Sequence, residues 1–397
     1  MQGEGADLLA GGRDRGARSR LALAPCPHRP PCSACPRYGA AGIAAPAAAA
    51  LAQLAQAHGL TRVPLVDGPI AAFRLRARLA IRGRIGSTKI GLFQEGSHRL
   101  VHVPECRVHH PLINRVAQTV RESLNDAQVP LYSDAAHQGL ARYLQVVIER
   151  RSQSAQVVLV ANSETADPLA PALALIRERL GSELHSLWFN SHRERGNAIL
   201  GSLFERIAGP ASVVESFGGA NVHYPPGAFG QSNLEIAGHI IDELRRQVPS
   251  GARLAELYAG VGAIGFSLLG QLQELRLNEV SPQSLQGLAM GLAELDPSAR
   301  ARVSVLAGPA STAIDVTAGA DVVIVDPPRK GLDEPLAQHL AAQPPQRLLY
   351  VSCDLGSLLR DVGRLLAHGR LRLAALSAFN LMPYTQHVET LARFERS

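Results

Sequence analysis

The stretch Arg253-Leu-Ala-Glu-Leu-Tyr-Ala-Gly-Val-Gly-Ala-Ile-Gly265 decides the fold of this chain. Its first half is a short apolar run that predicts a buried strand, and the glycines that follow open a helix. Glycines in such a turn let the main chain approach a ligand closely, and a helix N-terminus favours an anion or a carboxylate. Glu279 lies about 20 residues further on, where a carboxylate can accept hydrogen bonds from both hydroxyls of a ribose. The two features predict a nucleoside cofactor, and the single G-x-G favours S-adenosylmethionine over a dinucleotide.

Strands and helices alternate around this stretch. A helix is expected at 232–248, where apolar residues form one stripe that Pro249-Ser-Gly251 ends. Strands are expected at 253–258, 275–278, 303–306, 322–325, 348–351, 371–379 and 388–393. Helical stretches separate most of them, which predicts a parallel, doubly wound α/β sheet whose last two strands form an antiparallel pair at one edge.

Length and composition indicate several domains. A chain of 397 residues with 46% hydrophobic residues is expected to form two or three domains. Residues 1–25 are expected to be a disordered tail, because they are rich in Gly and Arg and have no apolar period. We assign 26–61 to a cysteine cluster with an Ala-rich segment, 62–216 to a central α+β domain and 217–397 to the doubly wound domain.

Charge and cysteine usage narrow the classes of function. The net charge of +6 suits a polyanionic partner. Lys89 and Lys330 are the only lysines, so Arg makes up the other 38 of the 40 basic residues, a bias typical of GC-rich genomes. No apolar run is long enough for a signal peptide or a membrane span, so a cytoplasmic protein is expected. In that reducing compartment the five cysteines are interpreted as ligands or reactive groups before disulfides.

Cys353 is a candidate nucleophile. It follows the apolar run Arg347-Leu-Leu-Tyr-Val351, at the carboxyl end of a predicted strand, where open α/β sheets place their chemistry. The preceding strand ends in Asp326-Pro-Pro-Arg329, and Glu389 shares a face with His387 in a segment of strand period. A cysteine or a glutamate alone in such a position usually serves packing or solvation. Their combination makes Glu389 a candidate base.

The other four cysteines form a candidate metal centre. Cys26-x5-Cys32-x2-Cys35 is a compact group, and Cys106 lies 71 residues beyond it. Four thiolates suit a tetrahedral zinc ion or a [4Fe-4S] cluster equally well by count. Unrelated buried thiols are the plain structural alternative.

A basic strand is a candidate RNA-binding surface. Phe73-Arg74-Leu-Arg76-Ala-Arg78-Leu79 alternates arginine with apolar residues, so a strand here would have one basic face and one buried face. Such a face is often only solvated, and phosphate contact is the functional alternative.

The chain resembles the S-adenosylmethionine-dependent RNA (uracil-5-)-methyltransferases of the TrmA-like family. The resemblance covers about residues 26 to 393 and rests on motifs in the family's order together with the cysteine spacing. The motifs are Phe229-Gly-Gln231-Ser-Asn233, Leu257-Tyr-Ala-Gly-Val-Gly262, Asp326-Pro-Pro-Arg-Lys-Gly331, Tyr350-Val-Ser-Cys353 and His387-Val-Glu389. It implies a Rossmann-like methyltransferase domain after a central α+β domain and a small N-terminal iron–sulfur region.

The resemblance also implies a covalent mechanism. Cys353 would attack C6 of uracil, which makes C5 nucleophilic, and Glu389 would remove the C5 proton. Arg329 would offset charge on the uracil oxygens, and the target base would be turned out of the RNA stack. The residues that match the family's S-adenosylmethionine contacts are Gln231, Tyr258, Glu279 and Asp326.

For the cysteine group, the resemblance implies a [4Fe-4S] cluster on Cys26, Cys32, Cys35 and Cys106. A short N-terminus with a cluster resembles the ribosomal branch, so 23S rRNA is the expected substrate, tRNA the alternative, and a monomer the expected form. Four positions depart from the family pattern, and none of them removes a reacting group: Gly230, Ala263, Asn380 and Tyr384.

Three other functions compete with this one. An RNA 5-methylcytosine methyltransferase also uses cysteine, but it would have Pro-Cys where this chain has Asp326-Pro-Pro. A radical S-adenosylmethionine enzyme would need C-x3-C-x2-C spacing. A non-enzymatic iron–sulfur RNA-binding protein with a relic methyltransferase fold would not need Cys353 and Glu389.

Overall fold

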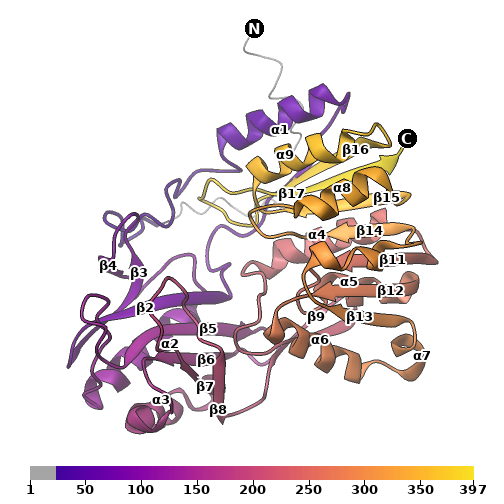
Figure 1. Cartoon of the computed structure of the whole chain (residues 1–397). Helices are drawn as coiled ribbons and strands as arrows, with labels where there is room; N and C mark the ends of the chain where they lie inside the picture. The colour runs from indigo at the N-terminus through magenta and orange to yellow at the C-terminus, as the bar shows by residue number, and fades with distance from the viewer. Residues whose placement is uncertain (1–23) are drawn as a thin grey trace.

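The computed structural model describes residues 24–397, and the expected disordered tail lies outside the described residues up to residue 23. Two large β-sheets with their helices make up the molecule, one from the central part of the chain and one from its C-terminal part (Figure 1).

The C-terminal sheet has eight strands. In spatial order they are β1 (Leu65–Val66), β16 (Leu371–Phe379), β17 (Glu389–Arg396), β15 (Arg347–Ser352), β14 (Val322–Val325), β11 (Ala252–Leu257), β12 (Leu272–Glu279) and β13 (Val303–Ala307). The strands from β15 to β13 run parallel, and β17 runs antiparallel to both β15 and β16. The predicted parallel sheet with a terminal antiparallel pair is confirmed, with β1 added at the edge beyond that pair.

Helices cover both faces of this sheet, because alternate residues of each central strand point to opposite faces. In β14, Val323 and Val325 belong to one buried cluster, whereas Val322 and Ile324 belong to another. The first cluster contains side chains of α1 (Ala45–Ala57), α8 (Glu334–Ala342) and α9 (Leu355–Leu366). The second contains side chains of α4 (Leu234–Gln247), α5 (Ala263–Leu268), α6 (Pro282–Glu294) and α7 (Pro297–Arg300).

The N-terminal helix belongs in space to this C-terminal layer. Leu51 and Leu54 of α1 lie in the same buried cluster as residues of α8 and α9, and Figure 1 shows the three helices on one side of the sheet. Leu65–Val66 then pairs in parallel with β16. The expected boundaries put α1 with the cysteine cluster and β1 in the central domain, so the structure differs from them at 45–66.

The central sheet has seven strands. Their order is β4 (Leu100–His102), β3 (Ser87–Phe93), β2 (Arg76–Arg84), β5 (Ala141–Glu149), β6 (Ser154–Ala161), β7 (Leu184–Ser191) and β8 (Leu203–Ala208). The helices α2 (Pro111–Asp126) and α3 (Ala170–Leu180) cover one face and bury its largest apolar cluster. A hairpin of β9 (Val213–Phe217) and β10 (Ala220–Tyr224) packs against the end of β5 and leads the chain to α4.

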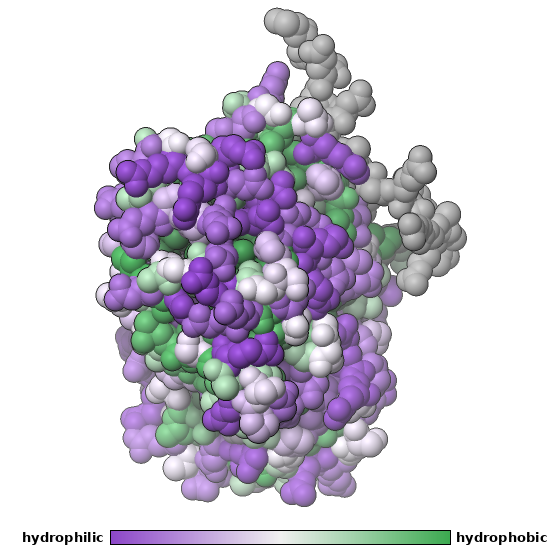
Figure 2. Space-filling view, turned by 90° about the vertical axis from the view of Figure 1, so that its right-hand side faces the viewer, coloured by the Kyte–Doolittle hydropathy of each residue, from purple (hydrophilic) through white to green (hydrophobic). Residues whose placement is uncertain are grey.

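The surface is mainly polar on the face that Figure 2 shows, where hydrophobic residues lie in areas separated by hydrophilic ones. Among residues 24–397, no helix has the length and apolar character that a membrane crossing requires.

Candidate active site

One edge of the C-terminal sheet collects the predicted site residues. The carboxyl ends of parallel strands meet at the same edge of a sheet. The residues at or just beyond the ends of β11, β12, β14 and β15 are Tyr258, Glu279, Asp326 and Cys353. Because β17 runs the other way, its first residue, Glu389, lies at this edge too. Ser352 pairs with Thr390, so Cys353 and Glu389 occupy the next position along the two strands, and the charge of Glu389 acts on the Cys353 thiol.

The Cys353 thiol lies among carboxyl groups. Burial raises its pKa to about 11, and the charges of Glu389 and Asp326 add to the rise, whereas Arg329 lowers it. Burial, and then the charge of Asp326, raise the pKa of Glu389 well above its usual range. Burial also raises the pKa of Asp326 to about 7. The arrangement favours a thiol and a protonated Glu389 in the free protein, and gives the Glu389 carboxylate an unusually high basicity.

The Glu389 side chain has no hydrogen bond to hold it. It is 4% exposed, and within residues 24–397 its Oε1 atom is buried without a partner. An unpaired buried carboxyl oxygen is costly, so such groups mark sites where a ligand or a proton is expected.

The sequence interpretation did not single out Glu256, which lies beneath the same site. This residue of β11 is 1% exposed, and its Oε2 atom has no partner among the described residues. Burial, followed by the charge of Asp326, raises its pKa to about 8. A Cβ on Gly265 would lie 2.5 Å from this oxygen, so the glycine turn leaves the carboxyl its space. The sequence could have singled out Glu256, because a charged residue within an otherwise apolar strand is rare.

Replacing Glu256 by glutamine should stabilise the fold at alkaline pH. The folded-state pKa of about 8 lies above the ordinary value of 4.5, so the native state holds a proton that the unfolded state releases. Native stability therefore falls by about 1.4 kcal/mol per pH unit between those values, a loss that glutamine removes. Urea unfolding of both proteins at about pH 5 and about pH 8 measures the difference.

The matched control is Glu274→Gln on the neighbouring strand β12. Hydrogen bonds from Arg276 lower the pKa of Glu274, so its carboxylate stabilises the fold at high pH. Glu274→Gln should therefore lower the stability at high pH, whereas Glu256→Gln should raise it. Equal pH dependence of wild type and Glu256→Gln would contradict the assignment of a buried neutral Glu256.

The glycine turn and Glu279 form one hydrogen-bonded unit. Tyr258 adopts a left-handed backbone with φ of 61°, and Gly260 follows with φ of 58°. The Glu279 carboxylate accepts hydrogen bonds from the main-chain N–H groups of Gly260 at 2.7 Å and Ser281 at 2.6 Å. Oε1 also accepts from the Val280 N–H at 2.8 Å, whereas Oε2 accepts from Gly260 and retains a lone pair, so the group can still accept a hydrogen bond from a ligand hydroxyl.

Gln231 lies on the segment between β10 and α4. Asn233 begins α4 by accepting a hydrogen bond from the Ile236 N–H, and its Nδ2 atom donates to the Leu381 carbonyl at 3.2 Å. The main-chain N–H of Leu75 donates to the Ser232 carbonyl. The Gln231 segment is therefore fixed between the central sheet and the loop before β17.

The three arginines of the predicted basic strand do not form one exposed face. Arg74 lines the cysteine pocket, and Arg78 is exposed with its Nε atom donating to Gln145. The guanidinium of Arg76 lies 4.0 Å from the ring centre of Tyr224, and its Nε atom is buried. The hairpin β9–β10 covers this part of the sheet, which the alternation of residues along β2 could not reveal. A Cβ on Gly230 would come within 2.6 Å of the Arg76 Cζ atom, so this glycine makes room for it.

The four other cysteines line one pocket. Cys26, Cys32 and Cys35 come from the N-terminal segment, and Cys106 comes from the loop before α2. Burial raises the pKa of Cys35 to about 11, with Arg74 lowering it, and burial also raises the pKa of Cys106. Within residues 24–397, no group of three or more His, Cys, Asp or Glu side chains is arranged to hold a metal ion. Four thiols that line one pocket fit an iron–sulfur cluster by chemistry, although their side chains are not arranged as a formed metal site.

Comparisons with known proteins find RNA methyltransferases among the relatives of this chain. A family model described as tRNA (Uracil-5-)-methyltransferase matches residues 313–396. The chain is 32% identical to an uncharacterized RNA methyltransferase of Protochlamydia amoebophila, over 84% of this chain and 88% of the relative. It is 28% identical to one of Thermosynechococcus vestitus, over 86% and 76% of the two chains.

Among solved structures, this fold is similar to Pyrococcus abyssi tRNA (uracil-54, C5)-methyltransferase in complex with S-adenosyl-L-homocysteine. The TM-score is 0.71 at 22% sequence identity, and the match covers 87% of this chain and 82% of that one. At this identity the likeness shows a common fold.

Proposed function

We propose, from the premise that this chain belongs to the RNA (uracil-5-)-methyltransferase family of S-adenosylmethionine-dependent enzymes, that it methylates C5 of a uracil in RNA through a covalent Cys353 adduct. The observation that carries the proposal is the meeting of a thiol and a buried, unpartnered carboxyl at one sheet edge, where the charge of Glu389 acts on the Cys353 thiol.

The chemistry needs both groups. The Cys353 thiol and the Glu389 carboxyl first release their protons to solvent. The Cys353 thiolate then adds to C6, and the electron pair of the C5–C6 double bond moves to C5 and the neighbouring carbonyl. S-adenosylmethionine, when bound, supplies the methyl group that C5 takes up. Glu389 then removes the C5 proton, the double bond re-forms, and the Cys353 thiolate is expelled. Arg329, whose charge already lowers the pKa of Cys353, offsets charge on the uracil oxygen.

Four residues are proposed to hold the cofactor. The Glu279 carboxylate takes the ribose hydroxyls, and the turn at Tyr258 lies against the nucleoside. Gln231 binds the amino-acid part of S-adenosylmethionine, and Asp326 lies between the cofactor and the uracil. Support comes from their topology, since Tyr258, Glu279 and Asp326 lie at one sheet edge and Gln231 lies on a segment fixed to the loop before β17.

The proposed substrate is 23S rRNA, with tRNA as the alternative. The cysteine group supports the ribosomal branch, whereas the description of the matching family model names tRNA. Purified protein should transfer labelled methyl from S-adenosylmethionine to unmodified 23S rRNA, and nuclease digestion should release 5-methyluridine. Label found in 5-methylcytidine, or no transfer to either RNA, would refute the proposed function, and transfer to tRNA alone would reassign the substrate.

The cysteine pocket is proposed to hold a [4Fe-4S] cluster that stabilises the N-terminal segment. Anaerobic reconstitution should load about four irons per chain, and Cys106→Ser should lower the iron content and the absorbance of the cluster. Cys353→Ser, which leaves the pocket intact, should retain full iron content. The support is that all four thiols line one pocket, and a reconstituted protein without iron would contradict the cluster.

A further inference from the structure

The loop before β17 has an unusual anchor at Tyr384. This residue is 2% exposed and adopts a left-handed backbone with φ of 69°, which residues other than glycine rarely do. Its hydroxyl donates to the Ile70 carbonyl at 2.8 Å, and its ring lies 5.1 Å from the ring of Tyr38. Since contacts from the N-terminal part of the chain hold this conformation, the loop depends on that part for its shape.

Arg37 joins the cysteine segment to the same loop. Its main-chain N–H donates to the Tyr384 carbonyl at 3.0 Å, and its guanidinium donates to the Thr385 carbonyl at 3.3 Å. The guanidinium also donates to the Ile43 carbonyl at 3.0 Å, just before α1. Its acceptors are all main-chain carbonyls, so this one cation fixes the paths of two segments that are more than 300 residues apart in sequence.

The cysteine pocket lies directly behind this anchor. Tyr384 belongs to a small buried cluster with Phe73 and Val108, against which Cys35, Tyr38 and Cys106 pack. A second anchor lies nearer the start of the loop, where the Nδ2 atom of Asn380 donates to Asp67 at 2.7 Å. The loop that carries the chain to Glu389 is thus held by residues from the N-terminal part of the chain.

We infer that the segment 26–38 positions Glu389, with Arg37 and Tyr38 as its positioning residues. Glu389 lies five residues beyond Tyr384, and its Oε1 atom has no partner among the described residues. Its position therefore comes from β17 and from the loop. A general base must lie about 2.6–3.2 Å from the atom that it deprotonates. A shift of this loop therefore impairs proton removal by Glu389 more than the attack by Cys353, because Cys353 lies between β15 and α9 and not on this loop. The inference rests on the proposed role of Glu389 and does not depend on a metal.

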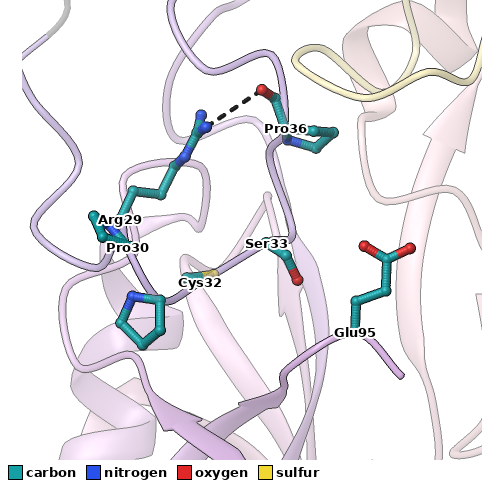
Figure 3. Close-up of a pocket in the computed structure, with 7 residues that line it drawn as sticks. Arg29, Pro30, Cys32, Ser33, Pro36 and Glu95 are labelled. Atoms are coloured by element: carbon teal, nitrogen blue, oxygen red, sulfur yellow. Dashed lines mark hydrogen bonds between the residues drawn. The ribbon is translucent and has the colours of Figure 1, made fainter. Parts of the chain in front are cut away.

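The variant that tests the inference is Arg37→Ala, and the matched control is Arg29→Ala. Figure 3 shows the Arg29 guanidinium directed to the Pro36 carbonyl. Among residues 24–397, the Arg29 guanidinium donates only to carbonyls of its own segment, those of Cys35 and Pro36, and to none of the loop. Both variants remove one arginine from the same segment, but only Arg37→Ala removes a guanidinium that donates to the loop, at the Thr385 carbonyl, while the main-chain bond to Tyr384 stays in both.

Two readouts separate the chemical steps. Tritium release from RNA labelled at uracil C5 reports proton removal, and adduct formation with 5-fluorouridine RNA reports the attack by Cys353. Arg37→Ala should slow tritium release about 10- to 100-fold, the scale of a small misplacement of a catalytic group, and leave the rate of adduct formation unchanged. Arg29→Ala should leave both rates unchanged. If Arg37→Ala does not fold, Arg37→Lys, which keeps the charge but loses the forked geometry, should slow tritium release alone by a smaller factor.

Equal slowing in the Arg37 and Arg29 variants, or equal loss of both readouts in the Arg37 variants, would overturn the inference. A wild-type protein that forms no adduct and releases no tritium would instead refute the proposed function. The two failures are therefore distinguishable.

Discussion

Replacing Cys353 by alanine is expected to abolish methyl transfer to RNA and the covalent adduct with 5-fluorouridine RNA. Without a bond to C6, the C5 carbon of uracil is too weak a nucleophile for the sulfonium methyl group, and no neighbouring thiol can substitute. Cys353 is the one cysteine at the sheet edge, because the other four line a separate pocket. Removing the nucleophile of a covalent mechanism costs about 10⁴-fold or more in turnover, measured as labelled methyl transfer under single-turnover conditions.

S-adenosylmethionine binding is the control for Cys353→Ala. The residues proposed to hold the cofactor follow other strands, so calorimetric affinity for S-adenosylmethionine should remain that of the wild type. A Cys353→Ala protein that still forms 5-methyluridine at a substantial fraction of the wild-type rate would refute covalent catalysis by this residue.

The C-terminal sheet was predictable from sequence because its signals are local. Each parallel strand is a short apolar run between helical stretches, as at 322–325, where the prediction and β14 coincide. Because such strands are buried on both faces, their sequences are continuous apolar runs. Surface strands instead alternate apolar and polar residues, so the two kinds can be told apart. The place of the site was predictable for the same reason. Residues at the carboxyl ends of parallel strands lie at one edge of the sheet, so the site could be located without predicting the loops. Their chemical roles remain predictions.

What the sequence could not reveal depends on long-range packing. The pairing of Leu65–Val66 with β16 joins residues about 300 positions apart, and a two-residue strand carries no periodicity. The alternation of residues predicted one basic face, but the hairpin β9–β10 covers that face at Arg76, while Arg78 stays exposed. The hydrogen bonds of Arg37 to the loop before β17 have no sequence signature, since main-chain carbonyls accept them.

Replacing Glu389 by glutamine is expected to trap the methylated covalent intermediate. Glutamine keeps the shape of the side chain but cannot accept the C5 proton, so Cys353 cannot be eliminated and turnover should fall about 10²- to 10⁴-fold. The steps before proton removal should survive, because glutamine, like the protonated Glu389 of the free protein, places no negative charge beside the Cys353 thiol. A denaturing gel should then show a protein–RNA adduct that carries the labelled methyl group.

Glu395→Gln is the matched control, since Glu395 lies on the same strand but pairs with Arg347 and Arg372 away from the site edge. It should turn over normally and accumulate no adduct. Free 5-methyluridine RNA released by Glu389→Gln at the wild-type rate would exclude Glu389 as the base. Of the other carboxyl groups, Glu279 is held by main-chain N–H groups and Glu256 lies beneath the site. Asp326 would then be the candidate base, because its pKa of about 7 keeps a large fraction ionised at neutral pH.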